Sequence, residues 1–252
     1  MPTRLLERQI SLLEHLTSAS AIFGDGAPPA RHLQGLDPAL LRLEAFFSHE
    51  KRMEKIHSTF PRIFEIMADD DRATIVRDFV KACPSVDIRR IENARQFYDF
   101  ACARWQRQPP RPPYLRDIAT CELAIADLRI KGKAQPPQPW TTGHGVRFRR
   151  NRDAVFLSCS YDIRPIFEDE VSDAVERRGV MLAILIPPQS DEPTIFEVPA
   201  PVFALLVELD NWTNRAGLGA MPELDALISE LAEHGLLEVC CNDSRTSEAR
   251  HS

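Results

Sequence analysis

The chain has 252 residues, of which 44% are hydrophobic and 27% charged, ordinary values for a globular protein that exclude wholesale disorder. Its 37 acidic and 31 basic side chains give a formal net charge of -6, which argues against a protein whose main task is to hold a nucleic-acid backbone. Glu7 and Glu14 interrupt the N-terminal apolar pattern, unlike a signal peptide, and no apolar run approaches the roughly 18 residues that cross a bilayer. The six cysteines lack CxxC spacing, so we expect reduced thiols and a cytoplasmic protein.

The first half of the chain has helical periodicity. Apolar side chains recur at helical spacing in residues 4–22, and a glycine- and proline-rich stretch follows. Asp37-Pro38 is a start signal, an N-cap residue before a proline in the first helical position, so a long helix should run through Ile56. Phe60-Pro61 marks a break, and further helices are predicted at 62–67, 71–84, 91–105 and 114–131, the last after the proline connector at 108–113.

The period changes in the second half. Two pairs of apolar segments, each joined by a short loop, indicate hairpins: 146–150 with 154–161, and 179–188 with 194–198. Residues 162–178 between the pairs should be helical. Helices at 199–209 and 222–234 and a last apolar strand through Val239 follow, and Gly235 is placed to close the last helix.

These segments predict an α+β protein. An all-α helical domain at 1–133 is followed by a proline- and glycine-rich linker at 134–145. A winged-helix-like domain should occupy 146–241, and a disordered tail 242–252.

The last helix carries charges that argue against DNA binding. A winged helix reads DNA with one helix in the major groove and with Arg and Lys on phosphates. Between Pro222 and His234 the charged residues are all acidic, and no Lys or Arg is present. DNA would repel this helix.

The same helix and the strand at 194–198 suggest a peptide-binding groove. An extended peptide could add to the strand, with backbone hydrogen bonds giving affinity and apolar pockets giving selectivity. The competing interpretation is that the apolar stripe of the helix packs in the core. The residues predicted to bind peptide are Ile195, Phe196, Glu197, Val198, Leu224, Leu227 and Ile228. Phe196 and Val198 should share one strand face, Ile195 and Glu197 the other, and the pattern leaves open which face is core.

Several stretches resemble known families. The element order of 180–240, ending in L-x-x-x-G-L-L, resembles the peptide-recognition elements of pathways that make ribosomally synthesised, modified peptides. PYLRDIATCELAIADLR at 113–129 resembles a Pro-Tyr-Leu-x-Asp-Leu-Ala-x-Leu-Glu-Trp-Ala segment in helical partner proteins of multinuclear iron oxidases, with Phe60-Pro61 and Phe79 to Pro84-Ser85 in matching order. Cys121 and Leu123 depart from that segment. Accessory subunits of the thiaglutamate pathway have similar segments to two in this chain, LLERQISLLEHL near the start and KRMEK at 51–55.

The resemblance implies a non-catalytic subunit that binds an iron-dependent oxidase and recruits a carrier peptide. The oxidase of such a complex uses dioxygen to excise the β-carbon of a cysteine at the peptide's C-terminus. Iron would then belong to the partner subunit, and this chain would hold no cofactor, no metal and no catalytic residue. We expect the segment Tyr114–Glu122 to support the fold first and to meet the oxidase only secondarily.

Two other function classes compete with this interpretation. An enzyme is disfavoured because the sequence has no HxH, HExxH, GxGxxG, P-loop or GxSxG pattern. The alternative function is a transcriptional regulator with a helical domain and a C-terminal winged helix. The basic cluster RFRRNR at 147–152, or the segment 104–116, would then have to supply the phosphate contacts.

Overall fold

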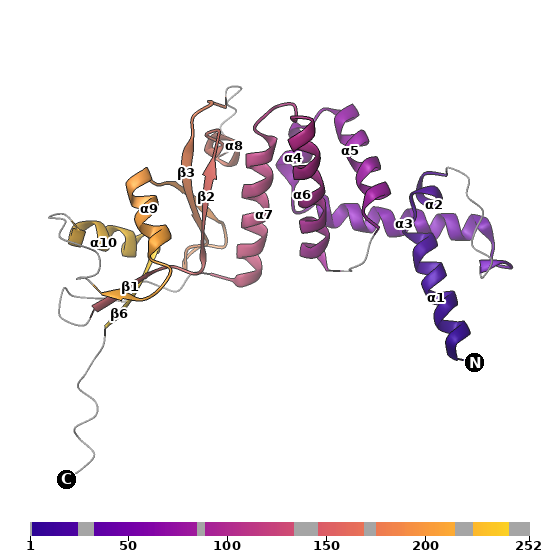
Figure 1. The fold of residues 1–252 in the computed structure, drawn as a ribbon, viewed down its shortest axis with the longest axis horizontal. Coiled ribbons are helices and arrows are strands. Elements are labelled where there is room, and N and C mark those ends of the chain that lie inside the picture. Colours follow the sequence, from indigo (N-terminus) through magenta and orange to yellow (C-terminus); the bar gives the residue numbers. More distant parts are fainter. Residues whose placement is uncertain are drawn as a thin grey trace, which may run out of the picture. The chain divides into compact units, whose positions relative to one another are not determined.

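The computed structural model describes residues 2–24, 33–84, 89–133, 146–168, 175–214 and 224–241, which form helices and two small antiparallel sheets (Figure 1). The predicted α+β class is therefore confirmed. Contacts divide the chain into two compact units, Met1–Leu123 and Ala124–Ser252. This division falls inside the last helix of the first half, and the predicted linker at 134–145 and tail at 242–252 lie outside the described residues. None of the helices in the described ranges is long and apolar enough to cross a membrane.

The first unit consists of helices whose limits follow local signals. Asp37 caps α3 as predicted, since its Oδ1 accepts a hydrogen bond from the Ala39 N–H at 2.9 Å. The single helix predicted at 4–22 is wrong, because Ser18 leaves the helix and its Oγ accepts from the N–H of Ala21, which starts a second helix. The helices are α1 (Pro2–Leu16), α2 (Ala19–Phe23), α3 (Pro38–His57), α4 (Pro61–Ile66), α5 (Asp69–Ala82), α6 (Arg90–Arg107) and α7 (Leu115–Lys131).

Aromatic rings form the centre of this unit. Phe60, Phe79 and Phe97 are fully buried. The ring centroid of Phe97 lies 5.6 Å from that of Phe60, 5.4 Å from that of Phe64 and 5.3 Å from that of Phe79. Because these rings come from α4, α5 and α6 and from the turn before α4, one aromatic cluster holds those helices together.

Buried Glu122 connects α7 to the start of α4. Its carboxylate accepts hydrogen bonds from the backbone N–H of Arg62 at 2.7 Å and of Ile63 at 3.3 Å. These N–H groups belong to the first turn of α4, where a helix lacks internal partners for them. Burial raises the pKa of Glu122 to about 8, although both N–H groups favour the charged form. With Leu115 and Ile118 also buried, this segment supports the fold, in agreement with the expectation for 114–122.

The raised pKa of Glu122 makes stability depend on pH. The folded state holds the proton between the unfolded pKa of about 4.5 and the folded pKa of about 8, so stability should fall as pH rises through this window. Relative to Glu122→Gln, the wild type should lose up to roughly 1.4 kcal/mol of its free energy of unfolding for each unit by which the pH rises. Urea unfolding at several pH values measures this. The exposed Glu54→Gln serves as the control and should retain the wild-type slope, and equal slopes for wild type and Glu122→Gln would refute the assignment.

The second unit contains two three-stranded sheets. In the first, β1 (Val146–Arg150) lies between β5 (Thr213–Asn214) and β6 (Leu237–Cys241). In the second, β3 (Val180–Leu185) lies between β2 (Ala154–Cys159) and β4 (Thr194–Glu197). All pairings are antiparallel. The helices are α8 (Arg164–Phe167), α9 (Ala200–Glu208) and α10 (Leu224–Glu233).

The predicted hairpin of 179–188 and 194–198 is confirmed, but the hairpin of 146–150 with 154–161 is wrong. Strands β1 and β2 exist and belong to different sheets. Asn151 is the reason. Its backbone N–H donates to Leu236 O at 2.9 Å, its Nδ2 donates to Gly235 O at 2.7 Å, and its Oδ1 accepts from Asp153 N at 2.8 Å. The turn is thus tied to the end of α10 instead of closing a hairpin.

The helix predicted at 162–178 is also wrong. Only Arg164–Phe167 is helical, residues 175–179 are extended or irregular, and 169–174 lie outside the described residues. Asp162 and Arg178 make a tertiary ion pair with each other at 2.6 Å instead of helical contacts. A charge pattern that suits a helix surface can therefore serve a loop equally well.

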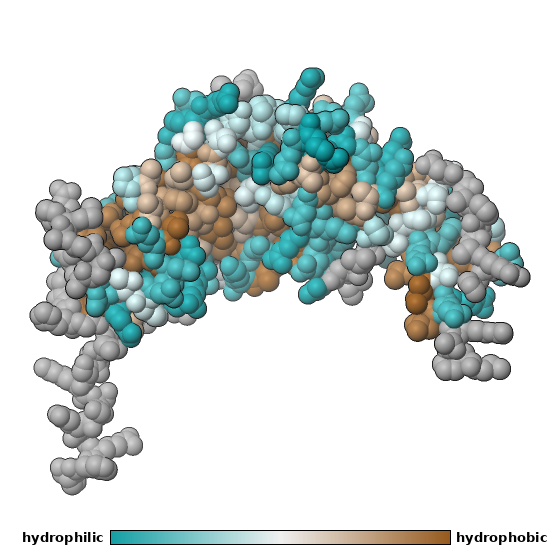
Figure 2. Space-filling view, viewed as in Figure 1, coloured by the Kyte–Doolittle hydropathy of each residue, from teal (hydrophilic) through white to brown (hydrophobic). Residues whose placement is uncertain are grey.

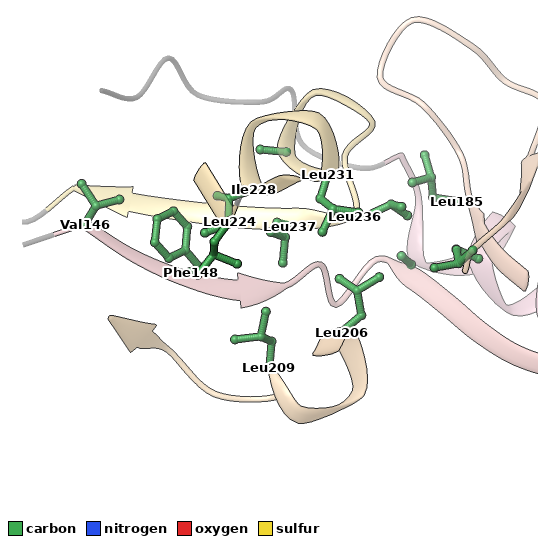
Figure 3. Packing of buried hydrophobic residues seen from close by; sticks show 14 residues of the cluster. Val146, Phe148, Leu185, Leu206, Leu209, Leu224, Ile228, Leu231, Leu236 and Leu237 are labelled. Atoms are coloured by element: carbon green, nitrogen blue, oxygen red, sulfur yellow. The ribbon is translucent and has the colours of Figure 1, made fainter. Parts of the chain in front are cut away.

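The core of the second unit joins both sheets to α9 and α10. Leu224, Ile228 and Leu231 point from α10 toward β1 and β6, and Leu206 and Leu209 come from α9 and its end (Figure 3). Gly235 ends α10 as predicted, with a φ of 72°. Its N–H donates to Ala232 O at 3.0 Å and the N–H of Leu236 to Leu231 O at 2.8 Å, a Schellman end that turns the chain into β6.

We expect Asn151→Ala to destabilise the second unit. The substitution leaves the partly buried carbonyl of Gly235 and the N–H of Asp153 without their side-chain partner, which costs about 1–3 kcal/mol. Thermal or urea unfolding measures the loss. Asn211→Ala, at an exposed position after α9, is the matched control and should change stability by less than about 0.5 kcal/mol. Equal stability of the two variants would show that the Asn151 contacts are unimportant.

Candidate functional site

Strand β4 forms an edge of its sheet. Within the described ranges, the sheet order is β2-β3-β4, so β4 has a strand neighbour on the β3 side alone. Its register pairs Phe196 with Ala183 and Glu197 with Leu182. Such an edge presents backbone groups that another extended segment can pair with.

The register shows which backbone groups face outward. The N–H of Val198 donates to Met181 O at 2.8 Å, so Val198 continues the ladder with β3. Hydrogen-bonded and non-hydrogen-bonded pairs alternate along an antiparallel ladder. Phe196 therefore also bonds toward β3, while the N–H and C=O of Ile195 and Glu197 point away from it. These four groups are the candidate site for an added strand.

Three of the seven predicted peptide-binding residues lie in the core. Leu224 and Ile228 have no exposed surface and Val198 is only 4% exposed. All three belong to one buried cluster with Phe148 and Leu206. A fully buried side chain offers no surface to a ligand, so these three do not line an open groove. Their part in the site is to fix the strand and the helix.

The other apolar residues lie at the margin of that cluster. Phe196 and Leu227 are partly buried and pack against it, and the Phe196 ring lies 5.5 Å from the His234 ring. Phe196 and Val198 thus face the core with α10, which answers the question of which strand face is core. Ile195 is partly buried on the opposite strand face. The structure brings Phe196 near the end of α10 and separates Ile195 from it.

Exposed Glu197 belongs to a network of four charged side chains. Its carboxylate accepts hydrogen bonds from Arg178 at 2.6 and 3.1 Å and pairs with Arg164 Nη2 at 2.5 Å. Both arginines also bind Asp162, with Arg164 donating to its two oxygens at 2.9 and 2.7 Å and Arg178 donating at 2.6 Å. The network ties β4 to the segments before α8 and before β3.

The arginines set the ionisation of both carboxylates. Hydrogen bonds from Arg164, and then from Arg178, hold the pKa of Asp162 down to about 2 despite burial. The hydrogen bond from Arg178 likewise lowers the pKa of Glu197. The carboxylates in turn raise the pKa of both arginines. At neutral pH the network consists of two anions and two cations. The negative charge of Glu197 is therefore balanced by the arginines within the network.

No spacing or motif in the sequence indicates this network. Asp162, Arg164 and Arg178 fall in the segment 162–178 that is predicted to be helical, and Glu197 is predicted to bind peptide. Ion pairs between residues so far apart in sequence leave no periodic signal. The pairing of β3 with β4 brings the Arg178 side chain, just before β3, within reach of Glu197.

Two of the four arginines in the basic cluster at 147–152 form ion pairs with acidic side chains. Arg149 pairs with Glu238 and stacks its guanidinium 4.5 Å from the Trp212 ring centroid. Arg150 pairs with Asp210 at 2.8 Å. Two of the arginines that the regulator alternative needs for phosphates therefore already have acidic partners in the protein.

The first unit has an open groove between α3 and α5, with a volume of about 710 Å³. His49, His57, Glu50, Asp69 and Arg72 are among its lining residues. Burial lowers the pKa of both histidines. In the part of the chain that the structure describes, no three His, Cys, Asp or Glu side chains gather closely enough to hold a metal ion. The prediction that this chain carries no metal stays a prediction.

The chain matches none of the protein-family models, and no curated protein matches it.

Replacing Asp162 should test the network. Its lowered pKa means that it stabilises the fold above pH about 4 and that this stability is lost as pH falls toward about 2. Asp162→Asn should therefore reduce the free energy of unfolding at pH 7 by about 2 kcal/mol and much less near pH 2. Asp191→Asn is the matched control, because Asp191 is 89% exposed in its pair with Lys133 and should contribute little. A loss independent of pH would contradict the ionic origin.

Proposed function

We propose that the protein is a non-catalytic partner subunit that recruits a carrier peptide to an iron-dependent oxidase. The peptide adds as a strand to the outer edge of β4, where Ile195 and Glu197 direct their backbone groups outward. In this proposal the second unit is the winged-helix-like peptide-recognition domain. The single observation that carries the proposal is that β4, with its partly buried side chains Ile195 and Phe196, lies at the edge of its sheet.

The edge of β4 has the features that strand addition needs. Two residues of outward backbone groups supply hydrogen bonds, and the side chains of an added strand would alternate between the two sheet faces. On the inner face they would meet Phe196 beside His234, and on the outer face Ile195 and the network around Glu197. Charged side chains are also a common means of protecting an edge from unspecific pairing. Glu197 thus favours a selective partner over indiscriminate association.

The oxidase part of the proposal rests on the resemblance of 113–129 and of the N-terminal segments to helical partner proteins of multinuclear iron oxidases. In the proposed complex the partner holds the iron and excises the β-carbon of a C-terminal cysteine. The described part of α10 supports a protein role over a DNA-binding one, because its charged residues Asp225, Glu230 and Glu233 are all acidic.

The test combines purification with one backbone substitution. Tagged protein is isolated from its native cells, iron is measured by elemental analysis and bound peptides by mass spectrometry. We expect an iron protein in near-equal amount together with a small peptide. Ile195→Pro removes an outward N–H and leaves the bonds toward β3 intact, as proline is tolerated on the solvent side of an edge strand. The peptide should be lost from this variant and the iron protein retained.

Ile195→Ala is the matched control, because it shortens the same side chain and keeps the N–H. It should retain most of the peptide, and circular dichroism should show both variants folded. Equal peptide recovery with folded Ile195→Pro would contradict binding at this edge. Recovery of the protein without any iron partner would contradict the recruiting function itself.

A further inference from the structure

Exposed apolar side chains concentrate in the first helices of the chain. Of the twelve exposed large apolar residues in the ranges that the structure describes, nine fall between positions 5 and 47. Side chains of this size are normally buried, and a concentration of them marks an interaction surface. Figure 2 shows the apolar strip along α1 at the right of the view. The nine residues, called here the N-terminal apolar face, are Leu5, Leu6, Ile10, Leu13, Leu36, Leu40, Leu43, Phe46 and Phe47.

Helix α3 has apolar residues on two opposite sides. Leu41, Ala45 and Ile56 are buried in the core of the unit. Leu40, Leu43 and Phe47, which are 48–58% exposed, repeat at i, i+3 and i+7 on the other side. A helix that faces solvent on one side has no physical need for this second stripe.

Helix α1 has a matching stripe. Leu6, Ile10 and Leu13 follow i, i+4 and i+7 and are 48–59% exposed. Since α1 packs against α3, the two exposed stripes lie on neighbouring helices. The segments of the chain outside the described ranges contain few large apolar residues and none in a repeated pattern, so their composition does not suit them to cover these stripes.

The charges around the face identify the kind of partner. Exposed Glu7, Arg8 and Glu14 lie on α1, and exposed Arg42 and Glu44 lie on α3. A helix that lies on a membrane surface needs a polar face rich in Lys and Arg, and a nucleic-acid site needs a positive surface. The mixed signs seen here fit neither. They suit a protein surface that carries the same mixture.

The extent of the face is sufficient for a stable dimer. Half-exposed side chains of this size each present on the order of 100 Å². Nine of them approach the roughly 800 Å² that one partner contributes to a standard interface. Two helices with uncovered apolar stripes also complete a stable layer architecture when a second such pair packs on them, as in a four-helix bundle.

We propose that the N-terminal apolar face binds the same face of a second copy of this chain. The contact is two-fold symmetric, so that α1 and α3 of both copies form a four-helix layer. This interface uses none of the residues of the peptide edge on β4.

Sedimentation equilibrium of the purified full chain tests the proposal. The wild type should have twice the monomer mass of 28.6 kDa. Phe47→Asp and, separately, Leu13→Asp should each raise the dimer dissociation constant by about 100-fold or more, because each substitution enters a two-fold interface twice. Val207→Asp is the matched control, since Val207 is 46% exposed on α9, outside the face, and should leave the dimer intact.

Circular dichroism and melting temperatures establish that the variants are folded, and the α1 substitution keeps the test valid if the α3 substitution does not fold. A monomeric wild type at about 100 µM, well above the range expected for a stable dimer, would overturn the proposal. So would folded variants that remain dimeric. If the wild type is monomeric on its own and both variants fail to recover the iron protein, the face belongs to that partner. Association of the wild type with anionic lipid vesicles would assign the face to a membrane.

Discussion

The second unit depends on the hydrogen bonds of one buried asparagine. Asn151 ends β1 and binds the backbone of Gly235 and Leu236 at the end of α10. This fixes β6 beside β1 and frees β2 to join β3 in the other sheet. Since β4 pairs with β3, the position of the candidate peptide edge follows from a turn more than forty residues earlier in the chain.

Two kinds of surface serve different purposes in the two units. The β4 edge presents backbone groups beside a compensated charge network, a combination that favours a partner of defined shape and register. The N-terminal apolar face presents apolar side chains and few accessible backbone groups. Such a surface favours association driven by the burial of apolar area. Each unit therefore has a candidate surface of its own.

Local signals predicted most helices correctly and long-range pairing poorly. The Asp37 cap, the Phe60-Pro61 break and Gly235 act within one helical turn, so the sequence displays them directly. The partner of β1 is β6, almost ninety residues away, and no spacing rule encodes such a choice. Proximity in sequence suggested β2 instead, and the buried hydrogen bonds of Asn151 decided otherwise.

The candidate site was predictable only in part, for the same reason. The apolar period of α10 correctly marks one face, but it does not distinguish a groove from a filled core, and Leu224 and Ile228 are in the core. Helix α3 illustrates a further consequence. Its core residues and its outward residues occupy different positions, so Leu40, Leu43 and Phe47 can change during evolution without altering the packing that folds the unit. Natural selection could therefore retune the association of this protein and its stability as separate traits.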